Sequence, residues 1–321
     1  MGEVSERRRI GWLGWAAMLL VLSALALGGF AWWALANNSV ASLDAVDARF
    51  SRSRTARLVE TGRYGEHPAQ KFEVFVPAGA APAGGFPLVA FYHGGGWRSG
   101  DPHDYRFIAR ALAERGYAAA LIGYRLKRDG RFPNMLLDSA AGLRKVRDLA
   151  AAHGIDASRI ALMGHSAGAY NASMLALDRR WLKDAGVPES AIKGAVVLSG
   201  PSDFYPFDKS SSKGAMGHWP RPQETQPINY ARADAPPLLL LHGTEDTSVR
   251  PRNSTILARV LSERGAPTKA TLIAGMGHNG PVITLARPFD RDRRVGDAVF
   301  GFLARVLPSD PASSPVQPAN R

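Results

Sequence analysis

The sequence contains no cysteine among its 321 residues, which excludes a disulfide framework, a thiolate nucleophile and a metal site with cysteine ligands. No internal repeat is visible, and no two histidines have the helical spacing and carboxylate support of a zinc site, so we expect neither a metal nor another cofactor. The formal net charge is +12, yet no nucleic-acid-reading motif is present, so we expect no nucleic-acid partner. The candidate catalytic groups are therefore hydroxyls, carboxylates and imidazoles.

Length and composition fit one domain with a sizeable core, since the chain is 45% hydrophobic and α/β folds of this size often form a single domain. Apolar strand-like runs alternate with stretches of helical spacing. We expect strands at residues 72–76, 88–92, 117–124, 160–163, 196–198, 238–241 and 270–273, and helices at 103–115, 136–153, 166–177, 254–264 and 297–306. This alternation predicts an α/β fold with a mostly parallel central sheet and helices on both faces.

An uncharged stretch of 26 residues, 11–36, follows three arginines near the amino terminus. At ~1.5 Å per residue a helix of this length exceeds the ~30 Å hydrocarbon core of a bilayer. We expect an N-terminal transmembrane helix that leaves the protein membrane-anchored, with the catalytic domain on the extracytoplasmic side because the arginines precede the span. The alternatives are a signal peptide cleaved after residues 34–36, giving a secreted or periplasmic protein, and a twin-arginine signal.

Two polar segments flank the expected catalytic domain, which covers residues 70–307. Residues 37–69 contain clustered arginines and indicate a basic linker. Residues 308–321 are rich in proline and serine, which predicts a disordered tail. Within the domain, the serine, glycine and proline content of residues 203–230 predicts a small lid.

The most informative motif is Gly-His-Ser-Ala-Gly at residues 164–168, directly after an apolar run. The glycines on either side allow a strand to turn sharply into a helix, which holds Ser166 in a strained conformation with its hydroxyl exposed above the sheet. Such a turn presents a nucleophile. The motif alone is a weak signal, because glycine and serine are common in ordinary turns.

Three further motifs strengthen this interpretation, each just after an expected strand. His-Gly-Gly-Gly-Trp at residues 93–97 offers backbone N–H groups to a developing oxyanion. Asp246 lies in His-Gly-Thr-Glu-Asp after the strand at 238–241, and His278 follows the strand at 270–273 between glycines. The order Ser166, Asp246, His278 is that of an α/β-hydrolase triad, unlike the chymotrypsin or subtilisin orders.

From about residue 70 to residue 307 the chain resembles α/β-hydrolase serine esterases with an HGGxW oxyanion loop, in the carboxylesterase and kynurenine-formamidase-like branch. The resemblance implies that Ser166 attacks the acyl carbon, that His278 moves the proton and that Asp246 orients His278. It also implies an oxyanion hole formed by the amides of Gly95, Gly96 and Ala167. The residue before the nucleophile is His165 and no large N-terminal cap is visible, which is unlike the hormone-sensitive-lipase group and argues against long-chain lipid substrates.

Some assignments stay open at this point. Glu245 and Asp203 are rivals to Asp246 as the acid, and we expect His93 to brace its glycine loop. Candidate substrate-binding residues, for which core packing is an equal alternative, are Trp97, Tyr170, Phe204, Trp219 and Met276. We expect a small-molecule ester with a short or aromatic acyl group as substrate. A formamide, a peptide or a catalytically silent binding role are the alternatives.

Overall fold

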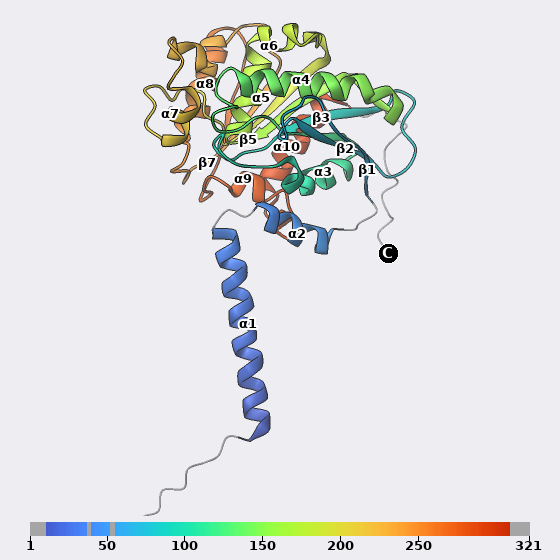
Figure 1. Ribbon diagram of the computed structural model, residues 1–321, viewed down its shortest axis with the longest axis vertical. Coiled ribbons are helices and arrows are strands. Elements are labelled where there is room, and N and C mark those ends of the chain that lie inside the picture. The colour runs from blue at the N-terminus through green and yellow to red at the C-terminus, as the bar shows by residue number, and fades with distance from the viewer. Residues whose placement is uncertain (1–10, 37–39, 52–54, 309–321) are drawn as a thin grey trace, which may run out of the picture.

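The computed structural model describes residues 11–36, 40–51 and 55–308 (Figure 1). Its centre is an eight-stranded sheet with the order β1-β2-β4-β3-β5-β6-β7-β8. The pairs β1/β2 and β2/β4 are antiparallel and the other neighbours are parallel. The strands are β1 (Ala56–Arg63), β2 (Lys71–Pro77), β3 (Phe86–Tyr92), β4 (Ala118–Ile122), β5 (Ile155–His165), β6 (Ile192–Leu198), β7 (Leu238–Gly243) and β8 (Ala270–Ile273).

Helices cover both faces of the sheet, as Figure 1 shows. One face carries α4 (Asn134–Leu149), α5 (Ala167–Leu177), α6 (Arg179–Asp184) and α8 (Arg252–Glu263). The other carries α2 (Val40–Phe50), α3 (Arg106–Ala113), α9 (Gly280–Ile283) and α10 (Arg293–Val306). A further helix, α7 (Ser210–Met216), lies beyond the end of β6, and α1 (Trp12–Ala36) precedes α2. The predicted mostly parallel sheet with helices on both faces is confirmed.

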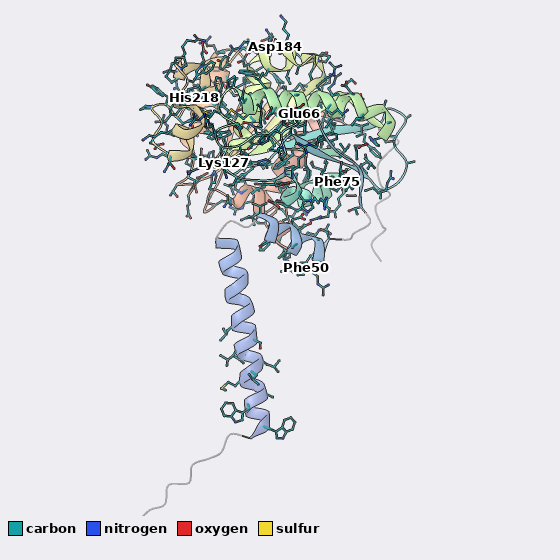
Figure 2. All side chains as sticks on the ribbon, in the orientation of Figure 1. Phe50, Glu66, Phe75, Lys127, Asp184 and His218 are labelled. Atoms are coloured by element: carbon teal, nitrogen blue, oxygen red, sulfur yellow. The ribbon has the colours of Figure 1, made fainter. Side chains whose placement is uncertain are left out.

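Strand residues alternate between two hydrophobic cores, because successive side chains of a strand point to opposite faces. On β2, Phe72, Val74 and Val76 face the core under α4 and α5, whereas Phe75 faces the core under α3 and is only 6% exposed (Figure 2). In contrast, Phe50 at the end of α2 is 58% exposed. The two cores hold the sheet rigidly, so the loops at its edges start from fixed positions.

The carboxyl ends of the parallel strands gather the predicted functional loops at one edge. The glycine loop follows β3, Ser166 follows β5, Asp246 follows β7 and His278 follows β8. In open parallel sheets, this is the edge where ligands bind. The topology therefore brings together residues that lie more than a hundred positions apart in the chain.

The structure corrects the prediction of an N-terminal transmembrane helix. Residues 12–36 do form one helix, α1. However, no helix among residues 11–36, 40–51 and 55–308 combines the length and apolarity that crossing a bilayer requires. Crossing the ~30 Å hydrocarbon core requires a helix of about 20 predominantly apolar residues, and no helix of the described residues meets that requirement.

The structure also differs from the linker expected at residues 37–69, which contains α2 and β1. Helix α2 is fixed by Arg110, which donates hydrogen bonds to the carboxylates of Asp44 and Asp47 at 2.5 Å each, and Leu43 is buried beneath it. Strand β1 pairs with β2 along its length. Both elements depend on partners that are distant in the chain, so the local sequence, which is polar, does not predict them. The predicted tail at residues 308–321 lies, apart from Pro308, outside the described residues.

Candidate active site

The turn after β5 has the backbone strain that the sequence predicted for Ser166. Ser166 has φ 55° and ψ −118°, a left-handed region that costs a non-glycine residue roughly 1–3 kcal/mol. The flanking glycines make the turn possible. A Cβ at Gly164 would lie 2.2 Å from the carbonyl oxygen of Gly168, and one at Gly168 would lie 2.0 Å from that of Tyr92. The backbone N–H of Ser166 donates to Leu198 O at 2.9 Å, which fixes the turn against β6.

The three residues predicted as a triad form one chain of hydrogen bonds. The Ser166 hydroxyl lies 2.8 Å from Nε2 of His278, and Nδ1 of His278 lies 2.7 Å from Oδ2 of Asp246. The rival acids lie elsewhere, since Asp203 pairs with Arg252 at 3.0 Å and Glu245 is exposed. Asp246 is thus the carboxylate that contacts His278.

Asp246 is held by four hydrogen-bond donors and is only 4% exposed. Oδ1 accepts from the backbone N–H groups of Ser248 and Val249 at 2.9 and 2.8 Å, and Oδ2 accepts from His278 and from Nε2 of His242 at 3.0 Å. Burial alone would raise the pKa of the Asp246 carboxyl, but hydrogen bonds from His242 and His278 outweigh it and lower the pKa below its ordinary value. The carboxylate therefore stays charged while it orients His278.

His242 is a second imidazole on this carboxylate, and our sequence analysis did not identify it. Its Nε2 also lies 2.8 Å from the carbonyl oxygen of Val249. Because both neighbours of Nε2 are acceptors, that nitrogen carries the proton, and Nδ1 accepts from the Ser254 hydroxyl at 2.8 Å. The position of His242, four residues before Asp246 at the end of a buried strand, is a signal that could have found it.

The backbone of His278 is fixed by two side chains from neighbouring loops. Its carbonyl oxygen accepts hydrogen bonds from Nε2 of His165 and from the hydroxyl of Ser199, both at 3.1 Å. Burial, followed by the nearby charge of His278, lowers the pKa of His165 to about 3. His165 is therefore a neutral brace between the nucleophile turn and the His278 loop.

The glycine loop presents unused amides beside Ser166. Gly95, Gly96 and Ala167 line the same cavity as the nucleophile, and no hydrogen bond recorded for the described part of the chain uses their N–H groups. Gly95 and Gly96 have φ values of 112° and 59°. A side chain at Gly95 would collide with the Ser99 carbonyl oxygen at 2.0 Å, which explains why glycine is required there. Such amides are suited to an oxyanion hole.

His93 braces this loop from inside the domain, as the sequence predicted. It is 1% exposed, its Nδ1 lies 2.7 Å from Gly94 O, and its ring stacks on Tyr124 at 4.4 Å between centroids. Burial lowers the pKa of His93 to about 4, so it is neutral near pH 7. The N–H of Gly94 donates to the hydroxyl of Tyr105, which fixes the start of the loop.

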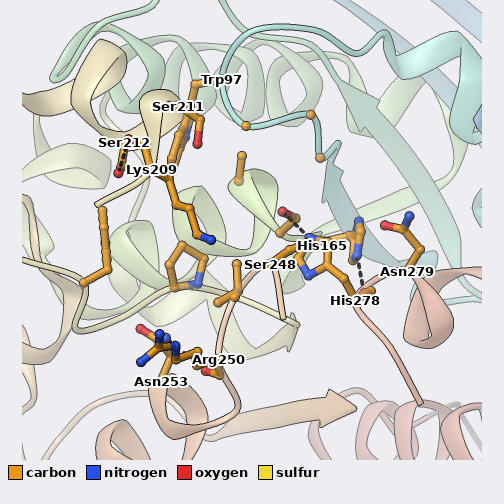
Figure 3. Close-up of a pocket in the computed structure, with 18 of the residues that line it drawn as sticks. Trp97, His165, Lys209, Ser211, Ser212, Ser248, Arg250, Asn253, His278 and Asn279 are labelled. Atoms are coloured by element: carbon orange, nitrogen blue, oxygen red, sulfur yellow. Dashed lines mark hydrogen bonds between the residues drawn. The ribbon is translucent and has the colours of Figure 1, made fainter. Parts of the chain in front are cut away.

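A cavity of about 780 Å³ opens over Ser166 and His278 (Figure 3). Trp97 and Phe204, two of the candidate substrate-binding residues, line its wall and stack at 6.3 Å between centroids. Tyr170, Trp219 and Met276 do not line it. Tyr170 packs edge-on behind Trp97, Trp219 packs on Phe132 away from the cavity, and Met276 is buried beneath the His278 loop. For these three, core packing is the observed arrangement.

Much of the cavity wall comes from the predicted lid segment, from the loop after β7 and from the start of α8, and many of its side chains are polar. These lining residues are Asp203, Tyr205, Pro206, Asp208, Lys209, Ser211, Ser212, Ser248, Val249, Arg250, Arg252 and Asn253. Within the described ranges, no cluster of three or more histidines and carboxylates could hold a metal ion. Whether residues 203–230 move as a lid stays a prediction.

The comparisons with known proteins agree with this geometry. Residues 72–261, more than half of the chain, match the BD-FAE family, and the chain belongs to that family. A solved esterase from Thermogutta terrifontis, Est2, has the same fold with a TM-score of 0.66 at 22% identity, covering 79% of this chain and 95% of that one. The fold is therefore that of the α/β-hydrolases.

Curated relatives carry esterase and amidase names. A probable isoprenylcysteine alpha-carbonyl methylesterase of Oryza sativa is 29% identical over 74% of this chain and 61% of its own length. A kynurenine formamidase of Danio rerio is 32% identical over 49% of this chain and 50% of its own length. The chain thus spans about half to three fifths of the relatives it matches. Family and fold together place the chain among the esterases of the α/β-hydrolase fold.

Proposed function

We propose that this protein hydrolyses small carboxylic esters through an acyl-enzyme on Ser166. The observation that carries the proposal is the unbroken chain of hydrogen bonds from Ser166 through His278 to Asp246, which opens on the cavity. Three features support nucleophilic catalysis, namely a hydroxyl on a strained turn that faces the cavity, a base in contact with it and a buried acid behind the base.

In the acylation step, Nε2 of His278 takes the Ser166 proton while Oγ attacks the ester carbonyl carbon. The charge that develops on the carbonyl oxygen is met by the N–H groups of Gly95, Gly96 and Ala167, and by the favourable field at the start of α5. The tetrahedral intermediate collapses when His278 returns the proton to the alcohol, which leaves. Asp246 stabilises the charged imidazole throughout.

In the deacylation step, water replaces the alcohol. His278 removes a proton from the water as its oxygen attacks the acyl carbon, and then returns the proton to Ser166 Oγ. The acid product leaves and the enzyme is restored. We propose short-chain or aromatic acyl groups as substrates, because Trp97 and Phe204 provide a limited aromatic wall while many of the other lining side chains are polar.

The test is turnover of 4-nitrophenyl esters by the wild type and by Ser166→Ala. We expect butyryl esters to be cleaved faster than palmitoyl esters, and the variant to lose several orders of magnitude in kcat while it keeps its thermal stability. Equal turnover by the variant would show that another group does the chemistry.

A second candidate is hydrolysis of an aryl formamide, favoured by the similarity to the Danio rerio kynurenine formamidase. The same residues would serve, with His278 protonating an amine in place of an alcohol. Comparing kcat/KM for an N-formyl arylamine with that for the formate ester of the matching phenol, each divided by its hydroxide-catalysed rate, decides between the two. The extracytoplasmic location stays a prediction, which cell fractionation would test.

A further inference from the structure

Two cations that line the active-site cavity have no acidic partner among the described residues. Lys209 and Arg250 line it, and for neither side chain does the described part of the structure record an ion pair or hydrogen bond. Figure 3 shows the Lys209 side chain extending into the cavity, with Arg250 on the loop that carries Ser248. The third lining cation, Arg252, differs because it is paired with Asp203 at 3.0 Å.

The backbones of both residues are fixed although their side chains are free. Lys209 precedes α7, and its carbonyl oxygen accepts from the N–H of Lys213 and the hydroxyl of Ser212, both at 3.0 Å. The carbonyl oxygen of Arg250 accepts from the N–H and from Nδ2 of Asn253, both at 3.0 Å. Two cations with anchored backbones, on different loops, thus line one cavity.

The acidic residues that line the cavity form no ion pair with Lys209 or Arg250 among the described contacts. Asp203 is met by Arg252, and Asp104 lies on a different element, the 3-10 turn of residues 102–105. Asp208 is exposed beside Lys209 without an ion pair among the described contacts. Hydroxyls of Ser211 and Ser248 line the same cavity and can donate to an anion.

We propose that the preferred substrate is an ester that carries a carboxylate, which Lys209 and Arg250 bind while Ser166 attacks the ester carbonyl. The proposal rests on the ester hydrolysis proposed above. A guanidinium binds a carboxylate through paired N–H groups and an ammonium adds a point charge, so the two together suit one carboxylate. Neutral esters would react at the same Ser166 without this contribution to binding.

The test uses two matched ester pairs, because the carboxylate could sit on either side of the ester bond. On the acyl side, the 4-nitrophenyl monoester of adipic acid is compared with 4-nitrophenyl 6-oxoheptanoate. On the alcohol side, 4-acetoxybenzoate is compared with 4-acetoxybenzamide. Each kcat/KM is divided by the rate of the same ester with imidazole, which removes differences in intrinsic reactivity. The quantity of interest is the corrected ratio of anionic to neutral ester.

We expect the ratio to exceed about tenfold for at least one pair at low salt, and to fall as salt is added. Lys209→Met and Arg250→Met should each lower it by part of that factor, mainly through KM of the anionic ester. Lys209→Glu should lower it further. Lys213→Met is the matched control, because Lys213 lies on α7 outside the cavity lining, and its ratio should equal that of the wild type.

A wild-type ratio near one for both pairs would overturn the proposal, as would an unchanged ratio in the folded double variant Lys209→Met/Arg250→Met. If a methionine variant fails to fold, Lys209→Arg and Arg250→Lys keep the charges and should keep the ratio, whereas Lys209→Gln and Arg250→Gln should lose it. Neutral esters distinguish failure of the carboxylate site from failure of the proposed ester hydrolysis by Ser166. If neutral esters are cleaved in a Ser166-dependent way without charge preference, only the carboxylate site fails.

Discussion

The loops that hold the triad and the segment that walls the cavity are built very differently. Asp246 is 4% exposed and receives four hydrogen bonds, and the turn at Ser166 is fixed by neighbouring strands. In the segment of residues 203–212, Tyr205 is 44% exposed, and several of the contacts that hold the segment lie at the surface. One of them joins Arg98 of the glycine loop to the hydroxyl of Ser210 at 2.9 Å. We propose that bond cleavage depends on the buried triad loops and that substrate selection depends on the more exposed segment.

The largest effect in the rigid part is expected from Asp246→Asn. An amide at this position cannot hold the Nδ1–H tautomer of His278, so kcat should fall on the order of 10⁴-fold. Steady-state hydrolysis of 4-nitrophenyl butyrate measures this loss. Glu245→Gln is the matched control and should be nearly silent, because Glu245 is exposed. A greater loss in Asp203→Asn than in Asp246→Asn would move the acid to the other loop.

The next largest effect is expected from Gly96→Val in the glycine loop. A β-branched residue at φ 59° must shift the backbone, which displaces an amide donor worth roughly 3 kcal/mol in the transition state. We expect kcat to fall by about a hundredfold or more with little change in KM. Gly116→Val is the control, because Gly116 also has a positive φ, 85°, but lies away from the cavity. A change confined to KM would show that the loop only shapes the pocket.

A smaller effect is expected from His242→Leu, which removes one donor from Asp246. The pKa of Asp246 should rise towards its ordinary value, and kcat should fall by about ten- to a hundredfold, the range expected for a hydrogen bond to a charged group. The acid limb of the pH profile for kcat should move to higher pH. His242→Gln, which can still donate, should restore part of the activity. A Leu variant with wild-type kcat and pH profile would show that His242 only packs.

The smallest effect on activity and a clear effect on stability are expected from the buried His93. Its folded pKa of about 4 lies below the ordinary value of 6.5, so the unfolded chain binds a proton that the folded chain refuses. His93 therefore destabilises the fold as pH falls from about 6.5 to 4, by up to a few kcal/mol. Urea unfolding measures the free energy of unfolding at pH 7.5 and at pH 5. Between these two pH values, it should fall less for His93→Asn than for the wild type. Equal losses in both proteins would contradict the assignment of a neutral buried imidazole.

The same contrast explains how much the sequence could predict. Residues at the ends of parallel strands could be placed, because the strands are apolar runs and the topology collects their ends at one edge; Ser166, Asp246 and His278 are examples. In contrast, α2 depends on the ion pairs of Arg110 with Asp44 and Asp47, which are distant in the chain. No local pattern encodes such partners.

The pocket was harder to predict for the same reason. An aromatic residue near the site can line the cavity, as Trp97 does, or pack behind the lining, as Tyr170 does, and only the three-dimensional arrangement decides between them. No local sequence pattern distinguishes Lys209 and Arg250 from other charged residues. They became candidates only because two loops bring them to one cavity.

The most direct test of the central claim is covalent labelling of Ser166 by a fluorophosphonate, read by mass spectrometry of the intact and digested protein. We expect one adduct per chain on the peptide that contains Ser166, loss of esterase activity in proportion to labelling, and no adduct on Ser166→Ala. Active enzyme that resists labelling, or a stoichiometric adduct on a different serine, would contradict the assignment of Ser166 as the nucleophile.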